Sequence, residues 1–445
     1  MSLLEKLGKT TATKDITKIE TEKVYKVEVN EKHEKLKEKV RNAIIDEYNT
    51  NNSEINAETA EVKSMIKRLL LSQGESISRF EESKLVQEIY DDVMGLGPLE
   101  PLLRDSKVSE IMVNAADEIY VEKSGKLMLT SAKFKDDDHV LNVINRIVSP
   151  LGRRCDESSP MVDARLADGS RVNAIIPPIA LKGPSLTIRK FSSTPLEIGD
   201  LIGFGTLSHK MANFLEACVK GRCNIIVAGG TGSGKTTLLN VLSGYIFDGE
   251  RIVTIEDAAE LQLSQSHIVT LEARPANVEG KGAIAIRDLV CNALRMRPDR
   301  IVVGECRSGE TLDMLQAMNT GHDGSLTTVH ANSPRDVVAR LETMVMMSGM
   351  QLPEKAIREQ IVSAIDIIVQ QSRLRDGSRK IVNISEIIGM EEGTVTMQDI
   401  FTFKSKGFGA DGKISGEFSP TGIRPRAVDK IKGNGVSFND DWFMK

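Results

Sequence analysis

The chain has 445 residues, which allows about three domains, and 40% of them are hydrophobic, enough for a sizeable packed core. Its net charge of −5 excludes a chain-wide basic surface as the main way of binding nucleic acid, and the aromatic content of 4% argues against stacking platforms for single strands. No apolar run approaches the roughly 18 residues that a membrane-spanning helix needs, and no signal peptide is expected at the N-terminus.

The N-terminal part of the chain predicts two small domains. Residues 1–30 are rich in Lys, Glu and Thr without periodicity, so we expect a disordered or weakly helical lead. Residues 31–94 carry apolar positions at helical spacing and predict a small helical bundle. Residues 95–191 contain short β-like runs around one helical stretch and predict an α+β domain. The Ser and Pro residues that follow predict a linker over 192–206.

The next region, 207–400, alternates short apolar runs with helical stretches. The apolar runs lie at 225–228, 252–255, 301–303, 326–329, 365–369 and 381–384. Buried strands that alternate with helices are typical of an α/β domain with a largely parallel sheet. Residues 401–445 are rich in Gly and predict a C-terminal tail with a hairpin at Asp411-Gly412.

A phosphate-binding loop is the strongest motif. GGTGSGKTT, residues 229–237, matches GxxxxGK[ST], follows an apolar strand and precedes an amphipathic helix. Glycines let backbone N–H groups converge on phosphate oxygens, while Lys235 would reach the β- and γ-phosphates and Thr236 would bind Mg²⁺. The residues expected to hold the nucleotide are Gly229, Gly230, Thr231, Gly232, Ser233, Gly234, Lys235, Thr236 and Thr237.

Acidic side chains follow two of the predicted strands. Glu305 ends one strand and has the character of a Walker B acid, because carboxylates at strand C-termini face the nucleotide. The cluster of Glu256, Asp257 and Glu260 could polarise the attacking water, although acids at a helix N-terminus would look the same. His330 ends a further strand, where a lone His is more often structural. No NKxD guanine signature is present, which favours ATP.

Four ordered segments together resemble a known family. GGTGSGKTT, TIEDAAEL, RPDRIVVGECRSGET and GHDGSLTTVHANSP are similar to the Walker A, Asp box, Walker B and His box of type II/type IV secretion and pilus ATPases. The segments GLGPLEPLL, SEIMVN, SLTIRKF and TGIRPR resemble the CpaF/TadA branch, which serves Tad (Flp) pilus assembly. The likeness covers about residues 31–430. It implies an α/β fold, with a RecA-like P-loop ATPase domain behind an α+β N-terminal domain and a small helical bundle.

The resemblance implies a role for each acidic and phosphate-binding position. Lys235 and Thr236 would hold phosphate and Mg²⁺, and Glu305 would be the Walker B acid, bound to Mg²⁺ partly through water. Glu260, the last acid of the Asp box, matches the position expected to activate water, with the two preceding acids in support. No zinc is expected, because the chain lacks the four-cysteine module of one branch of the family.

The resemblance also implies phosphate-sensing and charge-neutralising residues. His330, and with less support His322, would sense the γ-phosphate. Arg189 in TIRKF and Arg222 before the P-loop strand resemble arginines that reach the phosphates and neutralise charge in the transition state. For either arginine the alternative is an ordinary ion pair at the surface or between domains.

The function implied is an ATP-hydrolysing, Mg²⁺-dependent homo-hexameric motor. It would lie in the cytoplasm, attached through an inner-membrane platform protein, and power assembly of a Tad/type IV-like pilus or a related type II secretion machine, with retraction left open. Closure of the α+β domain onto the ATPase domain through the linker would convert γ-phosphate binding into movement.

Three alternatives stay open. A VirB11-type conjugation or effector-secretion ATPase would be distinguished by its neighbouring genes. A nucleic-acid translocase is disfavoured by the net acidity and sparse aromatics, and would be revived by an ATPase rate that nucleic acid stimulates. A scaffold that binds ATP without turnover is disfavoured by the presence of Glu260 and Glu305.

Overall fold

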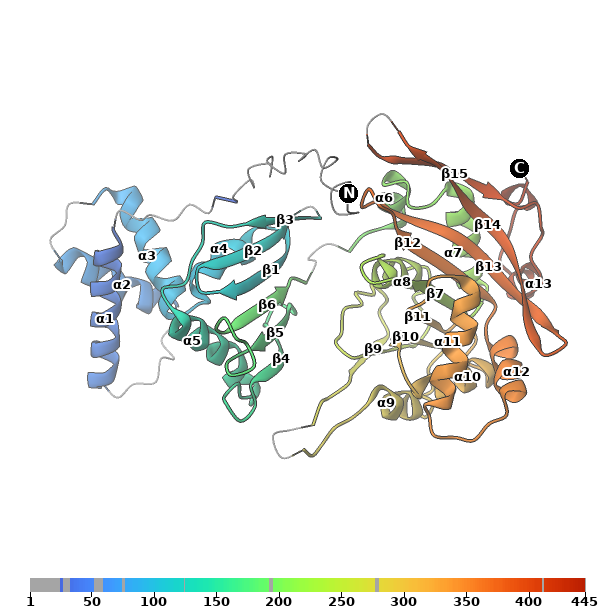
Figure 1. Ribbon diagram of the computed structural model, residues 1–445, viewed down its shortest axis with the longest axis horizontal. Coiled ribbons are helices and arrows are strands. Elements are labelled where there is room, and N and C mark those ends of the chain that lie inside the picture. The colour runs from blue at the N-terminus through green and yellow to red at the C-terminus, as the bar shows by residue number, and fades with distance from the viewer. Residues whose placement is uncertain are drawn as a thin grey trace, which may run out of the picture. The chain divides into compact units, whose positions relative to one another are not determined.

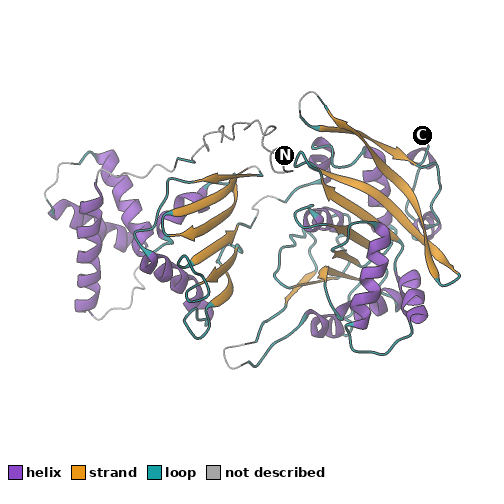
Figure 2. Cartoon of the chain, viewed as in Figure 1, coloured by secondary structure: helices purple, strands orange, loops and turns teal. Residues whose placement is uncertain are grey.

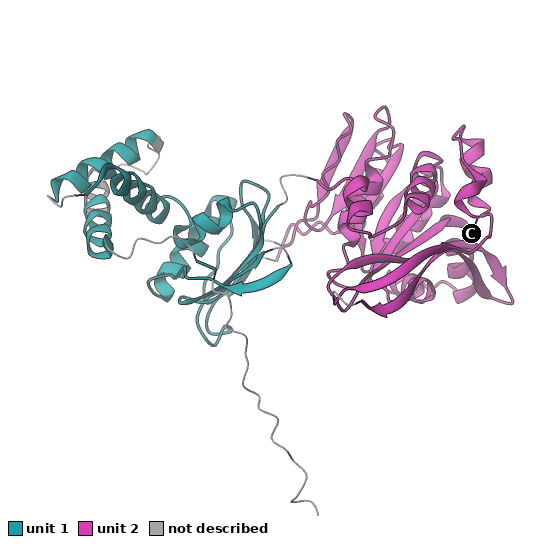
Figure 3. Cartoon of the chain, turned by 90° about the horizontal axis from the view of Figure 1, so that it is seen from above, with its two compact units in different colours: residues 1–192 teal, residues 193–445 magenta. Residues whose placement is uncertain are grey.

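The computed structural model describes residues 25–26, 33–51, 59–73, 77–123, 125–191, 195–276, 280–409 and 412–444. The chain divides into two compact units, Met1–Ser192 and Ser193–Lys445 (Figure 3). Of the expected N-terminal lead, only residues 25 and 26 are described, and Tyr25 forms a single β-bridge with Thr130. Within the described ranges, no helix is both long enough and apolar enough to cross a membrane.

Three helices open the first unit: α1 (Glu34–Asn51), α2 (Thr59–Ser72) and α3 (Arg79–Val93) (Figure 1). Their apolar faces form one core, because apolar residues recur at helical spacing. The buried members are Leu36, Val40, Ile44, Val62, Ile66, Leu70, Leu85 and Ile89. A capping box begins α3, in which the Ser78 side chain accepts from the N–H of Glu81 and the Glu81 side chain accepts from the N–H of Ser78.

An antiparallel sheet forms the rest of the first unit. Its order is β3-β2-β1-β6-β5-β4. The strands are β1 (Val108–Ala115), β2 (Glu118–Lys123), β3 (Lys126–Leu129), β4 (Met161–Arg165), β5 (Arg171–Ile175) and β6 (Ser185–Arg189). The helices are η2 (Gly97–Leu99), α4 (Glu100–Arg104), α5 (Asp137–Val148) and η3 (Ser149–Leu151). The apolar side of α5 contributes Val140, Val143 and Ile147 to the core of this sheet.

The second unit is built on a large sheet, whose strands are orange in Figure 2. It has nine strands in the order β15-β14-β13-β12-β7-β11-β10-β8-β9. Its strands are β7 (Ile225–Gly229), β8 (Ile252–Glu256), β9 (Ile268–Glu272), β10 (Arg300–Cys306), β11 (Leu326–Val329), β12 (Ile367–Arg373), β13 (Arg379–Glu391), β14 (Thr394–Phe408) and β15 (Ile414–Pro420). The run from β12 to β9 is parallel throughout, while β13, β14 and β15 are antiparallel additions at one side.

Helices cover both faces of this sheet. Successive residues of a strand point to opposite faces, so Ile225 and Val227 join the core with α7 (His209–Lys220), α8 (Lys235–Ser243) and α13 (Ala427–Gly433). Ile226 and Ala228 join the other core with α9 (Ile286–Ala293), α10 (Glu310–Asn319), α11 (Pro334–Met346) and α12 (Glu354–Ala364). The expected α/β fold class, with a mainly parallel sheet, is therefore confirmed.

The two ends of the second unit differ from the linker and the tail that the sequence predicts. Helix α6 (Ile198–Gly203) lies within the expected linker, yet its Leu201 is buried in the core of the unit. Strand β14 crosses residue 400, and residues 401–445 form no separate tail but complete the sheet and its core through β15, α13 and η4 (Asp440–Trp442). The hairpin expected at 411–412 joins β14 to β15, although Asp411 itself lies outside the described residues.

Candidate nucleotide site

The motif residues gather at one edge of the nine-stranded sheet because parallel strands end there together. The phosphate loop follows β7, Glu305 lies near the end of β10, and His330 directly follows β11. Glu256 is the last residue of β8. The strand order β7-β11-β10-β8 places these four strand ends side by side.

The phosphate loop has a backbone that only glycine tolerates at two of its positions. A Cβ on Gly229 would collide with the carbonyl oxygen of Gln371 on β12, and Gly234 has φ +94° where it caps the start of α8. The first turn of α8 therefore points its free N–H groups into the loop, which favours a bound anion. Lys235 is buried, and its ammonium donates to the carbonyl oxygen of Gly230 over 3.0 Å.

A chain of contacts links Lys235, His330 and Glu305. The Lys235 Nζ lies 3.4 Å from each ring nitrogen of His330, and His330 Nε2 lies 3.0 Å from Glu305 Oε1. The ring lies between the ammonium and the carboxylate, and Glu305 Oε1 accepts no hydrogen bond from the described residues. The geometry thus connects the expected phosphate lysine, phosphate sensor and Walker B acid through one imidazole.

Burial and charge set the protonation of this chain. Burial lowers the pKa of Lys235, while the nearby Glu305 carboxylate opposes that shift. Burial also lowers the pKa of His330, and the Lys235 charge lowers it further against the opposing effect of Glu305. Burial and the neighbouring ammonium therefore both favour the neutral form of His330.

Arg307 also belongs to this site, although the sequence analysis assigned it no role. Its guanidinium lies 2.5 Å from Glu305 Oε2 and 3.1 Å from Asp257 Oδ2, so it bridges the Walker B acid and the Asp box. The turn that carries it is fixed by Glu310 Oε1, which accepts from the N–H groups of Arg307 and Ser308. Its position two residues after the Walker B acid was the signal that could have drawn attention to it.

The Asp box is held in place by its first acid. The Glu256 carboxylate is buried and accepts from the N–H of Glu260 over 2.8 Å and from the N–H of Leu261 over 3.1 Å. Glu256 therefore fixes the turn that presents Glu260. The hydrogen bond to Glu305 raises the pKa of Arg307, and the charges of Glu305, Asp257 and Glu260 add to that shift, so the Glu260 carboxylate acts on the same guanidinium.

The oxygen donors here suit magnesium. Magnesium keeps several waters and takes one or two protein oxygens in addition to phosphate oxygens. Glu305 on β10 and Thr236 at the start of α8 are oxygen donors of that kind. In the part of the chain that the structure describes, no three His, Cys, Asp or Glu side chains are grouped to hold a metal alone.

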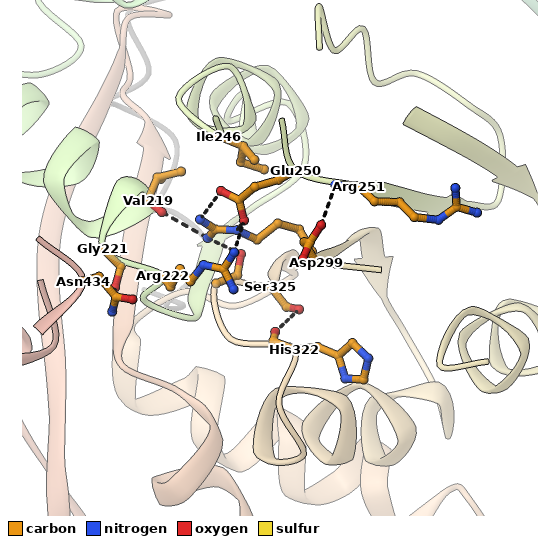
Figure 4. Close-up of polar contacts among 12 residues, drawn as sticks. Val219, Gly221, Arg222, Ile246, Glu250, Arg251, Asp299, His322, Ser325 and Asn434 are labelled. Carbon is orange, nitrogen blue, oxygen red and sulfur yellow. Dashed lines mark hydrogen bonds and ion pairs between the residues drawn. The ribbon is translucent and has the colours of Figure 1, made fainter. Parts of the chain in front are cut away.

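Two of the expected residues, Arg222 and His322, lie where the strands begin, not where they end at the phosphate loop; Figure 4 shows their polar contacts. Arg222 precedes β7, and its guanidinium donates to Glu250 over 2.7 Å. The same carboxylate binds the fully buried Arg300 at 2.8 and 3.0 Å. His322 precedes β11, where its carbonyl accepts from Ser325. Arg222 thus forms an ordinary ion pair, which was the alternative to a phosphate-binding role. Neither Arg222 nor His322 contacts Lys235.

Arg189 is the last residue of β6 and is exposed. It belongs to the first unit, and its role toward phosphate stays a prediction.

Comparison with known proteins identifies the family. A family model described as type II/IV secretion system protein matches residues 92–407. A putative conjugal transfer protein of Mycobacterium tuberculosis is 38% identical over 313 residues, which covers 69% of this chain and 88% of that protein. The type IV secretion system protein VirB11 of Bartonella quintana is 31% identical over 325 residues, covering 65% of this chain and 91% of its own length.

Solved structures of similar proteins also match. The VirB11 ATPase of Brucella suis is 30% identical and covers 64% of this chain and 94% of its own, with a TM-score of 0.36. The pilus retraction motor PilT with bound ADP is 21% identical and covers 74% and 83%, with a TM-score of 0.48. The family model matches well over half of the chain. This chain belongs to the family of type II/IV secretion system proteins.

Proposed function

We propose that this chain is an ATP-hydrolysing, Mg²⁺-dependent motor that works as a homo-hexamer. The observation that carries the proposal is the contact chain from Lys235 through His330 to Glu305 at the edge where the phosphate loop lies. A loop that only binds phosphate needs no carboxylate two contacts away from its lysine. Hydrolysis needs such a carboxylate, because charge develops on the γ-phosphate and on the attacking water.

Each residue has a distinct task in this proposal. Lys235 and the N–H groups of the loop hold the phosphates, and His330 reports the presence of the γ-phosphate to Glu305. Glu260 accepts the proton of the attacking water, in a turn that Glu256 holds rigid. A magnesium ion held by Thr236 and Glu305 would supply positive charge against the phosphate oxygens.

We further propose that the work done is assembly of a Tad/type IV-like pilus or a related type II secretion machine. The upstream segments GLGPLEPLL, SEIMVN and SLTIRKF support the CpaF/TadA branch. The motor would act at the cytoplasmic face of the inner membrane through a platform protein. A VirB11-type conjugation or effector-secretion ATPase is the second candidate, and the names of the Mycobacterium and Bartonella relatives favour it.

Phosphate release by the purified full chain tests the activity. Lys235→Ala should abolish hydrolysis and weaken ATP binding, while Glu305→Gln should slow hydrolysis with ATP still bound. Lys355→Ala is a matched control, because that lysine is exposed on α12 of the same unit. Turnover like that of the wild type in the Lys235 or Glu305 variant would refute the assignment of the site.

A strain that carries Lys235→Ala tests the biological process. Loss of surface pili with normal conjugation would support the pilus motor, whereas loss of conjugation or effector export with normal pili would support the VirB11-type candidate. Genes for prepilin and platform proteins beside this gene would also support the pilus motor.

A further inference from the structure

The phosphate loop has a second flank that the motifs do not describe. Strand β12 pairs with β7 on the side away from β11, with Gln371 in register with Gly229. The end of β12 and the turn to β13 therefore lie beside the loop, opposite the flank that carries His330. This turn holds three exposed arginines, at positions 373, 375 and 379.

One of these arginines binds the loop, and a second lies close to it. Arg379 Nε donates to the carbonyl oxygen of Gly232 over 3.1 Å, and its Cδ lies 3.2 Å from where a Cβ on Gly234 would stand. The Nη1 of Arg373 lies 3.6 Å from the corresponding point on Gly232. A Cβ at position 234 would press on the Arg379 side chain, whereas one at position 232 would make an ordinary contact with Arg373.

The two arginines also face each other without a counter-charge. Arg373 and Arg379 are directly opposed in the antiparallel register of β12 and β13. Like charges in that relation destabilise a sheet. Among the described residues no carboxylate lies within ion-pair distance of either guanidinium, whereas Arg300 pairs with Glu250 and Arg358 pairs with both Glu342 and Glu354. An anion bound between these two cations would relieve their mutual repulsion.

The phosphate chain of a bound nucleotide is such an anion. Strand β12 is the neighbour of β7 on the side away from β11 and β10, so a phosphate chain that ran from Lys235 and Glu305 across the loop toward β12 would reach these arginines. We propose that Arg373 and Arg379 form a second cationic wall of the nucleotide site. Arg373 binds the phosphate chain directly, and Arg379 is a positioning residue that holds the loop through Gly232. The inference rests on the proposed function, that this site binds ATP.

Competition binding tests the direct contact. A fluorescent ATP analogue bound to the full chain is displaced by ATP or by inorganic tripolyphosphate, which has the phosphates without the nucleoside, at matched free Mg²⁺. Arg373→Gln should weaken both competitors by about tenfold, and the loss should shrink as salt is raised, because an exposed cation is screened. Arg375→Gln is the matched control, an arginine of the same turn with no contact to the loop, and it should bind as the wild type does.

The positioning role of Arg379 needs a readout that a simple loss of stability would not give. Arg379→Gln should weaken tripolyphosphate and also lower kcat, because the loop carries Lys235. Arg379→Lys should restore much of both, since an ammonium can still donate to the Gly232 carbonyl. Equal defects in the Gln and Lys variants would overturn the positioning role.

The remaining outcomes separate this inference from the function on which it rests. A wild-type chain that binds neither ATP nor its analogue would refute the proposed function itself. A wild-type chain that binds ATP while Arg373→Gln matches Arg375→Gln would refute only the second wall. Weakened ATP with unchanged tripolyphosphate would also overturn it, because the arginine would then contact the nucleoside.

Discussion

Arg300 offers the sharpest test of how the sheet holds its strands. Its side chain is fully buried, donates twice to Glu250, and donates to the carbonyl oxygens of Val219 and Gly324. Arg300→Met fills a similar volume but leaves both carbonyls without that donor, and Glu250 keeps only its bond from Arg222. Removing one partner of a buried ion pair costs about 3–5 kcal/mol, and we expect a loss of that size.

Arg222→Ala should behave very differently. Its side chain is 34% exposed, and Glu250 keeps both bonds from Arg300 when it is removed. Exposed ion pairs are worth about 0–1 kcal/mol, so the loss should stay below about 1 kcal/mol. Arg222 also has φ +60°, which costs a non-glycine residue about 1 kcal/mol, and Arg222→Gly should therefore be close to neutral. Neither variant should impair hydrolysis.

The double variant supplies the decisive comparison. With both arginines gone, the nearly buried Glu250 has lost both cations that neutralise it, so the combined loss should exceed the sum of the single losses by at least about 1 kcal/mol. Urea unfolding followed by tryptophan fluorescence reports on the second unit specifically, because Trp442 is the single tryptophan of the chain and contacts its core. Additive losses, or a stable Arg222→Ala chain without hydrolysis, would refute the reasoning.

Two further predictions follow from single contacts. Glu256→Ala should lower the hydrolysis rate by about tenfold with ATP binding preserved, because the turn that presents Glu260 loses a charge-assisted acceptor. Glu256→Gln keeps an acceptor and should keep most of the hydrolysis rate. Equal rates for the two variants in a phosphate-release assay would contradict this prediction. Burial raises the pKa of Asp92 on α3 from 3.8 to about 6, so its contribution to stability is full below pH 3.8 and is lost as pH rises through 6. Asp92→Asn should therefore protect α3 from hydrogen exchange at about pH 8, by up to ~3 kcal/mol, and the exposed Asp138→Asn should not.

The sequence was sufficient for the elements whose pattern is unambiguous. Strands buried on both faces read as continuous apolar runs, so β7, β8, β10 and β11 were predicted close to their observed bounds. Strand β9 lies at the edge of the sheet, and β14 and β15 are largely exposed on the residues that follow Phe401. The exposed parts of β14 and β15 have a polar, Gly-containing sequence, which was interpreted as a tail, and the short β9 was not predicted as a strand.

The residues of the site also fall into those that the sequence could predict and those that it could not. Lys235 begins the helix after the phosphate loop of β7, while Glu305 and His330 lie at the ends of β10 and β11, so their meeting could be predicted from the parallel sheet alone. Arg222 also flanks a strand, but at its beginning, and resemblance alone did not reveal that its side chain binds Glu250. Arg379 reaches the loop from β13, and finding it required the order of β12 and β7 in the sheet, which no local pattern encodes.

The opposite edge of the sheet explains why the site can be precise. Asn224, which precedes β7, accepts at its side-chain oxygen from the N–H groups of Gly324 and Ser325 before β11, and donates its own N–H to Asp366 before β12. Lys430 on α13 then bridges Asp323 and Asp366 at 2.8 and 2.9 Å. The beginnings of β7, β11 and β12 are thus fixed to one another by buried or half-buried bonds. Because each strand is short and rigid, fixing the beginnings also fixes the spacing of the phosphate loop, His330 and the arginine turn at their far ends.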